Sequence, residues 1–179
     1  IPAIYDKGKN ALVKVHSISK LEDGTTLFEN TASLMCRGEG GFGGDRGPED
    51  KPPAPPEGKD PDFTVNYPTL NIQAYLYRLS GDYNPLHADP KFAKMAGFDR
   101  PILHGLATYG FTGRGVLHSV CGSDPAKFKS FSARFSKPVF PGETLIIKGW
   151  KLERGKYVVQ TETDSGNVVM TGGVVEVDE

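Results

Sequence analysis

Hydrophobic and polar residues alternate near both ends of the chain, and this pattern predicts β-strands. Near the N-terminus, ALVKVHSI (residues 11–18) alternates, and TLFENTASLMCR (residues 26–37) follows after the turn signal EDG. We therefore expect residues 1–37 to form strands that include a hairpin. Near the C-terminus we expect about four antiparallel strands, in FSARFSKPV, TLIIKGWKL, KYVVQTET and VVMTGGVVEV, because turn signals separate these segments.

The segments between these strands follow a helical spacing instead. TLNIQAYLYRLS (residues 69–80) predicts a short helix, and PKFAKMAG (residues 90–97) predicts another that begins at a proline and ends at a glycine. The longest apolar-rich segment, RPILHGLATYGFTGRGVLHSVCG, predicts a helix that starts at Pro101 and is apolar on nearly every face. Such a helix should be buried. An antiparallel sheet curved around this central helix is the economical packing, so the fold class is α+β.

A segment rich in glycine and proline separates the two patterned regions. Its composition cannot bury enough apolar surface to offset the entropy of ordering, so we expect a linker over residues 38–66. The domains are then a partial unit over residues 1–37 and a complete unit over residues 67–179. The spacing G-x-G-x-x-G occurs at Gly38, Gly40 and Gly43, but prolines follow where a dinucleotide site needs a helix, so this site is not favoured.

Composition and charge exclude several classes of function. The net charge of −1 gives no global field that would attract nucleic acid or an acidic membrane surface. No apolar run approaches the roughly 20 residues that span a bilayer. The two cysteines, Cys36 and Cys121, lie far apart, which favours a reducing compartment over a disulfide framework. There is no C-x-x-C or H-E-x-x-H motif, so no metal site is predicted.

The loop LSGDYNPLHADP (residues 79–90) carries the first candidate chemistry. Its glycine and prolines bend the chain, and the bend could bring the carboxylate of Asp82 and the imidazole of His87 over one cavity. Such a pair can deprotonate a water and return the proton elsewhere. Asn84 could fix one member of the pair or make an Asx turn. By spacing alone, a solvated polar turn is the commoner explanation.

The second candidate is His104-Gly105, near the start of the apolar helix. The first N–H groups of a helix have no internal acceptor, and a glycine there leaves its N–H open to a developing oxyanion. The structural alternative is a glycine kept for close packing. For His104 we expect a half-buried histidine whose hydrogen bonds are satisfied.

Both candidates belong to a longer pattern. YRLSGDYNPLHADPKFAKMAGFDRPILHGLATYGF resembles the signature of the MaoC-like hydratases, and within that family the eukaryotic 2-enoyl-CoA hydratases 2. ARFSKPVFPGETL, YDKGK and GEGGFGG are also similar to segments of this group. The resemblance implies a hot-dog fold, with one complete hot-dog and the strands of an incomplete first repeat. The activity implied is the reversible hydration of trans-2-enoyl-CoA to (3R)-3-hydroxyacyl-CoA in fatty acid β-oxidation.

The resemblance also implies roles for single residues. Asp82 and His87 match the catalytic pair, with Asn84 as the supporting residue, and Gly105 matches the backbone donor to the thioester oxygen. Contacts to the CoA substrate are implied at two further positions, namely Lys7 and the backbone near Phe135. The chemistry calls for neither a metal nor another cofactor.

Family members with two hot-dogs extend further toward the N-terminus. We therefore expect either a homodimer or association with a missing N-terminal segment. A peroxisomal location is implied by the resemblance alone, since the chain ends in VEVDE. Two alternatives stay open: a (3R)-hydroxyacyl thioester dehydratase of fatty acid or polyketide synthesis, which would use the same residues, and a non-catalytic acyl-CoA-binding hot-dog.

Overall fold

The computed structural model describes every residue except 50, 51 and 179. It contains two compact units, Ile1–Lys51 and Pro52–Glu179. Each unit has its own sheet, and each is described by itself.

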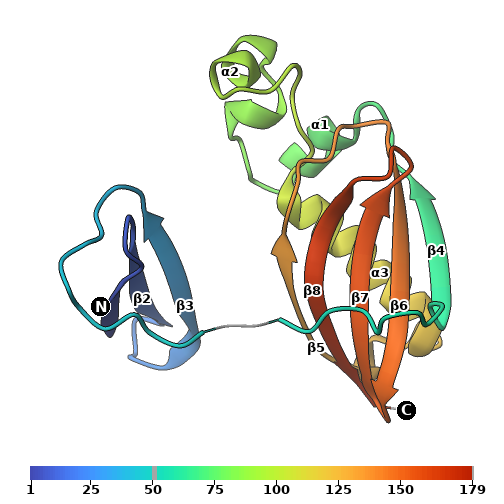
Figure 1. Cartoon of the computed structure of the whole chain (residues 1–179), viewed down its shortest axis with the longest axis horizontal. Coiled ribbons are helices and arrows are strands. Elements are labelled where there is room, and N and C mark those ends of the chain that lie inside the picture. Colours follow the sequence, from blue (N-terminus) through green and yellow to red (C-terminus); the bar gives the residue numbers. More distant parts are fainter. Residues whose placement is uncertain (50–51, 179) are drawn as a thin grey trace. The chain divides into compact units, whose positions relative to one another are not determined.

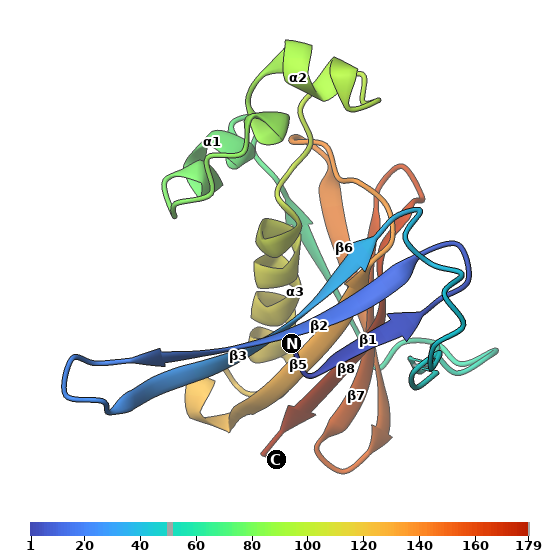
Figure 2. The ribbon, with the colours of Figure 1, turned by 90° about the vertical axis from the view of Figure 1, so that its left-hand side faces the viewer.

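The first unit is a three-stranded antiparallel sheet in the order β1-β2-β3. Its strands are β1 (Ala3–Asp6), β2 (Ala11–Lys20) and β3 (Thr26–Cys36). The predicted hairpin is confirmed, because β2 and β3 pair along their length, from Ala11 opposite Cys36 to Lys20 opposite Thr26 (Figure 2). Nearly all of β3 is exposed within the chain.

The glycine-rich segment after β3 folds back onto Asp6 at the end of β1. The Asp6 carboxylate accepts hydrogen bonds from the N–H groups of Gly8 (2.8 Å), Gly41 (2.9 Å) and Gly43 (2.7 Å). The chain approaches so closely that a Cβ on Gly40 would lie 2.3 Å from the carbonyl oxygen of Gly8. The first part of the expected linker is therefore ordered, because glycines let backbone donors converge on one carboxylate.

The second unit is a five-stranded antiparallel sheet in the order β4-β6-β7-β8-β5 (Figure 1). The four predicted C-terminal strands are confirmed as β5 (Phe128–Phe135), β6 (Thr144–Glu153), β7 (Lys156–Thr163) and β8 (Val168–Val177). The edge strand β4 (Phe63–Pro68) pairs with β6 and begins inside the segment expected to be linker. Partly buried and exposed residues alternate along β4, as in a strand with one face on the core. The nearby prolines hid this alternation in the sequence.

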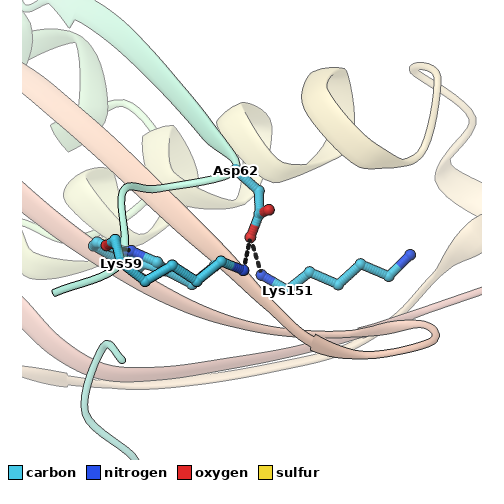
Figure 3. A network of polar contacts seen from close by, with 4 residues as sticks. Lys59, Asp62 and Lys151 are labelled. Carbon is cyan, nitrogen blue, oxygen red and sulfur yellow. Dashed lines mark hydrogen bonds and ion pairs between the residues drawn. The ribbon is translucent and has the colours of Figure 1, made fainter. Parts of the chain in front are cut away.

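The residues just before β4 are tied to β6 by polar contacts. Asp62 accepts hydrogen bonds from the Lys59 ammonium (2.8 Å) and from the backbone N–H of Lys151 (2.7 Å), as Figure 3 shows. The indole N–H of Trp150 donates to the backbone carbonyl of Lys59 at 2.9 Å. The Lys59 side chain, through its hydrogen bond, contributes most to holding the pKa of Asp62 below its usual value.

The long helix α3 (Gly105–Val120) runs along the concave side of this sheet (Figures 1 and 2). Its inner face joins strand residues in one core, whose fully buried members include Val116, Leu145, Ile147, Val159 and Val175. The prediction of a helix buried on every side is wrong for one face, because the side chains of Leu106, Arg114 and His118 are exposed within this chain. Leu106 keeps 60% of its surface accessible.

The helix also begins later than the predicted start at Pro101. Residues 101–104 belong to no helix or strand, and the N–H of Leu103 donates to the carbonyl of Val139 at 2.7 Å. His104 is the residue that precedes the first helical turn. This places Gly105 at the N-terminus of α3.

Short helices occupy the end of the sheet where α3 begins (Figure 1). They are α1 (Gln73–Arg78), the 3₁₀ turn η1 (Pro85–His87) and α2 (Pro90–Met95), while a second 3₁₀ turn, η2 (Pro125–Lys127), follows α3. The predicted start of α2 at Pro90 is confirmed, and Asp89 caps the helix, since its carboxylate accepts from the N–H of Lys91 at 2.8 Å. The loop between α1 and α2 carries the first candidate chemistry.

Candidate active site

The loop from Asp82 to His87 is shaped by its own polar groups. The N–H of Asn84 donates to the Asp82 carboxylate at 3.1 Å, and the Asn84 side-chain oxygen accepts from the N–H of Leu86 at 3.0 Å. Asn84 therefore caps the 3₁₀ turn that ends at His87. The arrangement is the Asx turn expected as an alternative, and it also fixes where Asp82 and His87 lie.

His87 points inward from this loop. Its Nδ1 lies 2.8 Å from the backbone carbonyl oxygen of Ile102, which can only accept a hydrogen bond. Nδ1 therefore carries a proton, and in the neutral ring Nε2 is left with a lone pair. The imidazole is only 9% exposed and lines a pocket. A lone pair held in this way suits a general base.

Gly105 lies on the same pocket. The first hydrogen bonds of α3 run from the N–H groups of Ala107 and Thr108 to the carbonyl of His104, so the Gly105 N–H has no acceptor inside the helix. The positive end of the helix dipole adds to the attraction of this donor for negative charge. The ring of Phe135 packs over the glycine, since an added Cβ would lie 3.3 Å from its Cζ atom.

The pocket itself is mainly apolar and has a volume of about 300 Å³. Its walls come from the end of the loop, the start of α3, and the segment after β5. Among its lining residues are His87, Ile102, Gly105, Thr108, Phe135 and Ser136. The imidazole of His87 and the N-terminus of α3 thus border one cavity large enough for the reacting end of a small-molecule substrate.

His104 lies between the two candidates and differs from expectation. It is 1% exposed, and its Nε2 lies 3.3 Å from the backbone carbonyl of Asp82. Its Nδ1 has no hydrogen-bond partner among the described residues. Burial, and then the neighbouring His87, lower the pKa of His104. The prediction of a half-buried, satisfied histidine is therefore wrong.

The side chains of Asp82, His87 and His104 form a compact group, with one potential ligand atom from each lying within 4.8 Å of the others. A shared metal ion does not fit this group. The two imidazoles stack face to face, with centroids 3.8 Å apart and planes inclined by 27°. A metal ion lies in the ring plane about 2 Å from the nitrogen, so stacked rings cannot both direct a lone pair at it.

The two residues predicted to bind CoA are in different units. Phe135, at the end of β5, lines the pocket. Lys7 belongs to the first unit, where its ammonium donates to the carbonyl of Arg46 and lies 5.7 Å from the centre of the Tyr5 ring. Its contact with a CoA bound at the pocket stays a prediction.

Sequence reasoning missed several groups that form the site. The Ile102 carbonyl orients His87, Thr108 lines the pocket, and Tyr77 stacks on His104 with centroids 4.7 Å apart. No residue pattern marks a carbonyl acceptor. The signal available for Tyr77 was its position on the inner face of the predicted helix.

A curved antiparallel sheet around one long helix, with the loop of Asp82 and His87 near the helix N-terminus, defines the second unit as a hot-dog domain. A family model described as "MaoC like domain" matches residues 53–173. The chain belongs to this family, so the resemblance drawn from the loop and helix segments is confirmed.

Curated relatives align along nearly the whole chain. "Probable enoyl-CoA hydratase 2" of Dictyostelium discoideum is 45% identical over 99% of this chain and 62% of its own length. "3-hydroxyacyl-thioester dehydratase Y" of Mycobacterium tuberculosis is 47% identical over 97% of this chain and 62% of its own. "Enoyl-CoA hydratase 2, peroxisomal" of Arabidopsis thaliana is 41% identical over 99% and 60%. The chain thus spans about three fifths of the length of these relatives.

Solved structures confirm the fold. A MaoC-like dehydratase from Phytophthora capsici superposes with a TM-score of 0.85 and 37% identity, over 98% of this chain and 62% of that one. The full-length peroxisomal multifunctional enzyme type 2 of Drosophila melanogaster gives a TM-score of 0.80 and 41% identity, over 98% and 32%. Within the described residues, no helix is long and apolar enough to cross a membrane.

Proposed function

We propose that the protein is a hydro-lyase that reversibly hydrates trans-2-enoyl-CoA to (3R)-3-hydroxyacyl-CoA in fatty acid β-oxidation. One observation carries the proposal: His87, whose Nδ1–H donates to the Ile102 carbonyl, and Gly105, the first residue of α3, line the same pocket. The names of the relatives from Dictyostelium and Arabidopsis, both enoyl-CoA hydratases 2, support the same reaction.

The chemistry starts from the thioester carbonyl. When its oxygen accepts a hydrogen bond from Gly105, electron density leaves the double bond and C3 becomes electrophilic. Preorganised donors of this kind contribute about 10²–10³-fold to the rate in comparable sites. The helix dipole at the start of α3 stabilises the enolate-like charge that develops on this oxygen.

Water is the nucleophile. It is held between Nε2 of His87 and the carboxylate of Asp82, gives up one proton as its oxygen bonds to C3, and C2 takes up a proton. The elements of water are added without oxidation or reduction, so Asp82 and His87 supply the acid and base that the reaction needs. Asn84 shapes the loop that holds both partners.

The test is the loss of enoyl thioester absorbance during incubation with trans-2-enoyl-CoA. The wild type should turn over, and Asp82→Asn should lose about 10²–10⁴-fold in kcat, as expected for removal of a general acid or base. Asp164→Asn is the matched control, because Asp164 is an exposed residue in the turn between β7 and β8. A wild-type rate for Asp82→Asn would contradict the assignment.

A second candidate is dehydration of a (3R)-hydroxyacyl thioester in biosynthesis. It is favoured by the 47% identity to a protein named "3-hydroxyacyl-thioester dehydratase Y". The same residues would catalyse the reverse reaction, so the two differ in the carrier. Comparing kcat/KM for CoA and carrier-protein thioesters of one acyl chain decides between them.

We also propose a partner and a location. The exposed apolar side chains of Leu76 and Leu106 support a surface covered by a second copy of the chain or by a preceding segment. Sedimentation equilibrium distinguishes a homodimer from a monomer. A peroxisomal location is supported by the name of the Arabidopsis relative, and fluorescence microscopy of the tagged full-length protein tests it.

A further inference from the structure

His104 lies between two other rings, one tilted against it and one stacked on it. The centroid of its imidazole lies 4.7 Å from that of the Tyr77 ring of α1, with the planes inclined by 44°. The centroid of the His87 ring lies 3.8 Å away, with the planes inclined by 27°. With 1% of its surface exposed, the side chain is enclosed by neighbouring atoms. The ring of His104 therefore limits where the ring of His87 can lie.

Two hydrogen bonds cross between the loop and the segment that leads into α3, and they run in opposite directions. His87 donates its Nδ1–H to the carbonyl of Ile102, at 2.8 Å. His104 faces the backbone carbonyl of Asp82, at 3.3 Å from Nε2, so Nε2 carries the proton that it donates. Together these two hydrogen bonds hold the loop against the residues immediately before Gly105.

The remaining nitrogen of His104 argues against a role in packing alone. Its Nδ1 is buried without a partner among the described residues, and an unpaired buried acceptor is unfavourable for folding. A phenyl ring of similar shape would fill the stack without this penalty. What a phenyl ring could not provide is the hydrogen bond to the Asp82 carbonyl.

We propose that His104 is a positioning residue for the hydration: by stacking on His87 and donating to the Asp82 carbonyl, it sets the distance between the two groups that hold the water. This inference rests on the proposed function. Because His104 directly precedes Gly105, the same side chain also fixes the loop relative to the oxyanion donor. His104 itself does not contact the reacting atoms.

Two substitutions separate the contributions of the ring and the hydrogen bond. His104→Phe keeps an aromatic ring in the stack and removes the donor to Asp82. His104→Gln keeps a donor near the position of Nε2 and removes the ring. The control is His118→Phe, which makes the same chemical change on an exposed histidine near the other end of α3.

We expect kcat of His104→Phe to fall by about 10²-fold with KM changed less than about threefold, because small misplacements of catalytic groups cost rates of that order. His104→Gln should recover part of this loss, and His118→Phe should behave as the wild type. A kcat for His104→Phe within about threefold of wild type, in a preparation that turns over enoyl-CoA, overturns the inference. A wild type without turnover contradicts the proposed function instead.

A spectroscopic measurement tests these two hydrogen bonds independently of enzyme activity. In ¹⁵N NMR spectra of the wild-type imidazoles, His87 should be protonated at Nδ1 and His104 at Nε2. The opposite tautomer at either residue overturns the inference, even if a variant fails to fold. In His104→Phe, we expect His87 to stay protonated at Nδ1, because the Ile102 carbonyl still accepts its hydrogen bond. A loss of kcat in that variant with an unchanged His87 tautomer is then caused by the missing donor to Asp82.

Discussion

The imidazole of His87 donates its Nδ1–H to the backbone carbonyl of Ile102 across 2.8 Å. The acceptor lies three residues before Gly105, so the contact connects the acid–base loop to the start of α3. It decides the tautomer, because a carbonyl oxygen can only accept. The nitrogen left facing the pocket is the one that can take a proton from water.

This contact predicts that His87→Asn separates stability from catalysis. The asparagine amide can take the place of Nδ1–H and donate to Ile102, but it offers no base at the position of Nε2. We expect the unfolding midpoint in urea to stay near that of the wild type, while kcat falls by about 10²–10⁴-fold. His118→Asn is the control, since His118 lies outside the pocket. Retained turnover in His87→Asn would show that another group is the base.

A methyl group at Gly105 should obstruct the oxyanion donor. In Gly105→Ala, the new Cβ would lie 3.3 Å from Cζ of Phe135, so the ring must shift by a few tenths of an ångström toward the pocket. We expect kcat/KM to fall by about 10- to 100-fold. Replacing the ring as well, in Gly105→Ala/Phe135→Leu, should restore part of the rate.

Gly110→Ala is the matched control for that variant. An added Cβ there meets no atom within 4 Å, and the position is exposed on α3. We expect unchanged turnover and a gain of about 0.5–1 kcal/mol in the free energy of unfolding. Equal losses of activity in both alanine variants would indicate an effect on the helix rather than on the donor.

The first unit should depend on the carboxylate of Asp6. The backbone N–H of Gly41, then those of Gly43 and Gly8, lower the pKa of Asp6. A carboxyl group with a lowered pKa stabilises the fold above its ordinary value near 3.8, and this stabilisation is lost as the pH falls through the folded-state pKa. Asp6→Asn should therefore speed limited proteolysis within residues 38–47 at neutral pH, and Asp60→Asn should not. Equal cleavage rates would contradict the role of Asp6.

The second unit should lose stability in mild acid. The pKa of His104 is lowered in the folded state, so the unfolded chain binds more protons between that value and about 6.5. Stability should be fully present above pH 6.5 and should decrease as the pH falls toward the folded-state pKa. Thermal unfolding followed from pH 7.5 to 5 measures this, and His104→Phe should show a shallower decrease. An unchanged slope in that variant would assign the effect to other groups.

The strands and helices of the second unit could be predicted because their local patterns agree with their tertiary surroundings. The strand segments from Thr144 to Val177 alternate or are bounded by turn residues, and Asp89 caps α2 as its position before a proline indicates. The exposed face of α3 could not be predicted. Apolar residues on every side of a helix do not tell which side this chain covers.

The motif named candidate residues but not their geometry. Asp82, His87 and Gly105 lie at the same end of α3, and their catalytic roles stay predictions. The Ile102 carbonyl, the stack on Tyr77 and the orphaned nitrogen of His104 depend on three-dimensional packing that no spacing encodes. The order in the glycine-rich segment was missed for a similar reason, since its hydrogen bonds reach back to Asp6 across more than 30 residues.

We propose that Asp82 and His87 direct the addition of one water to an enoyl thioester. The decisive measurement is incubation of the protein with trans-2-enoyl-CoA in H₂¹⁸O, followed by chiral separation and mass spectrometry. We expect (3R)-3-hydroxyacyl-CoA with ¹⁸O at C3, formed by the wild type and nearly abolished in His87→Asn. A product of S configuration, or equal labelling by wild type and variant, would contradict it.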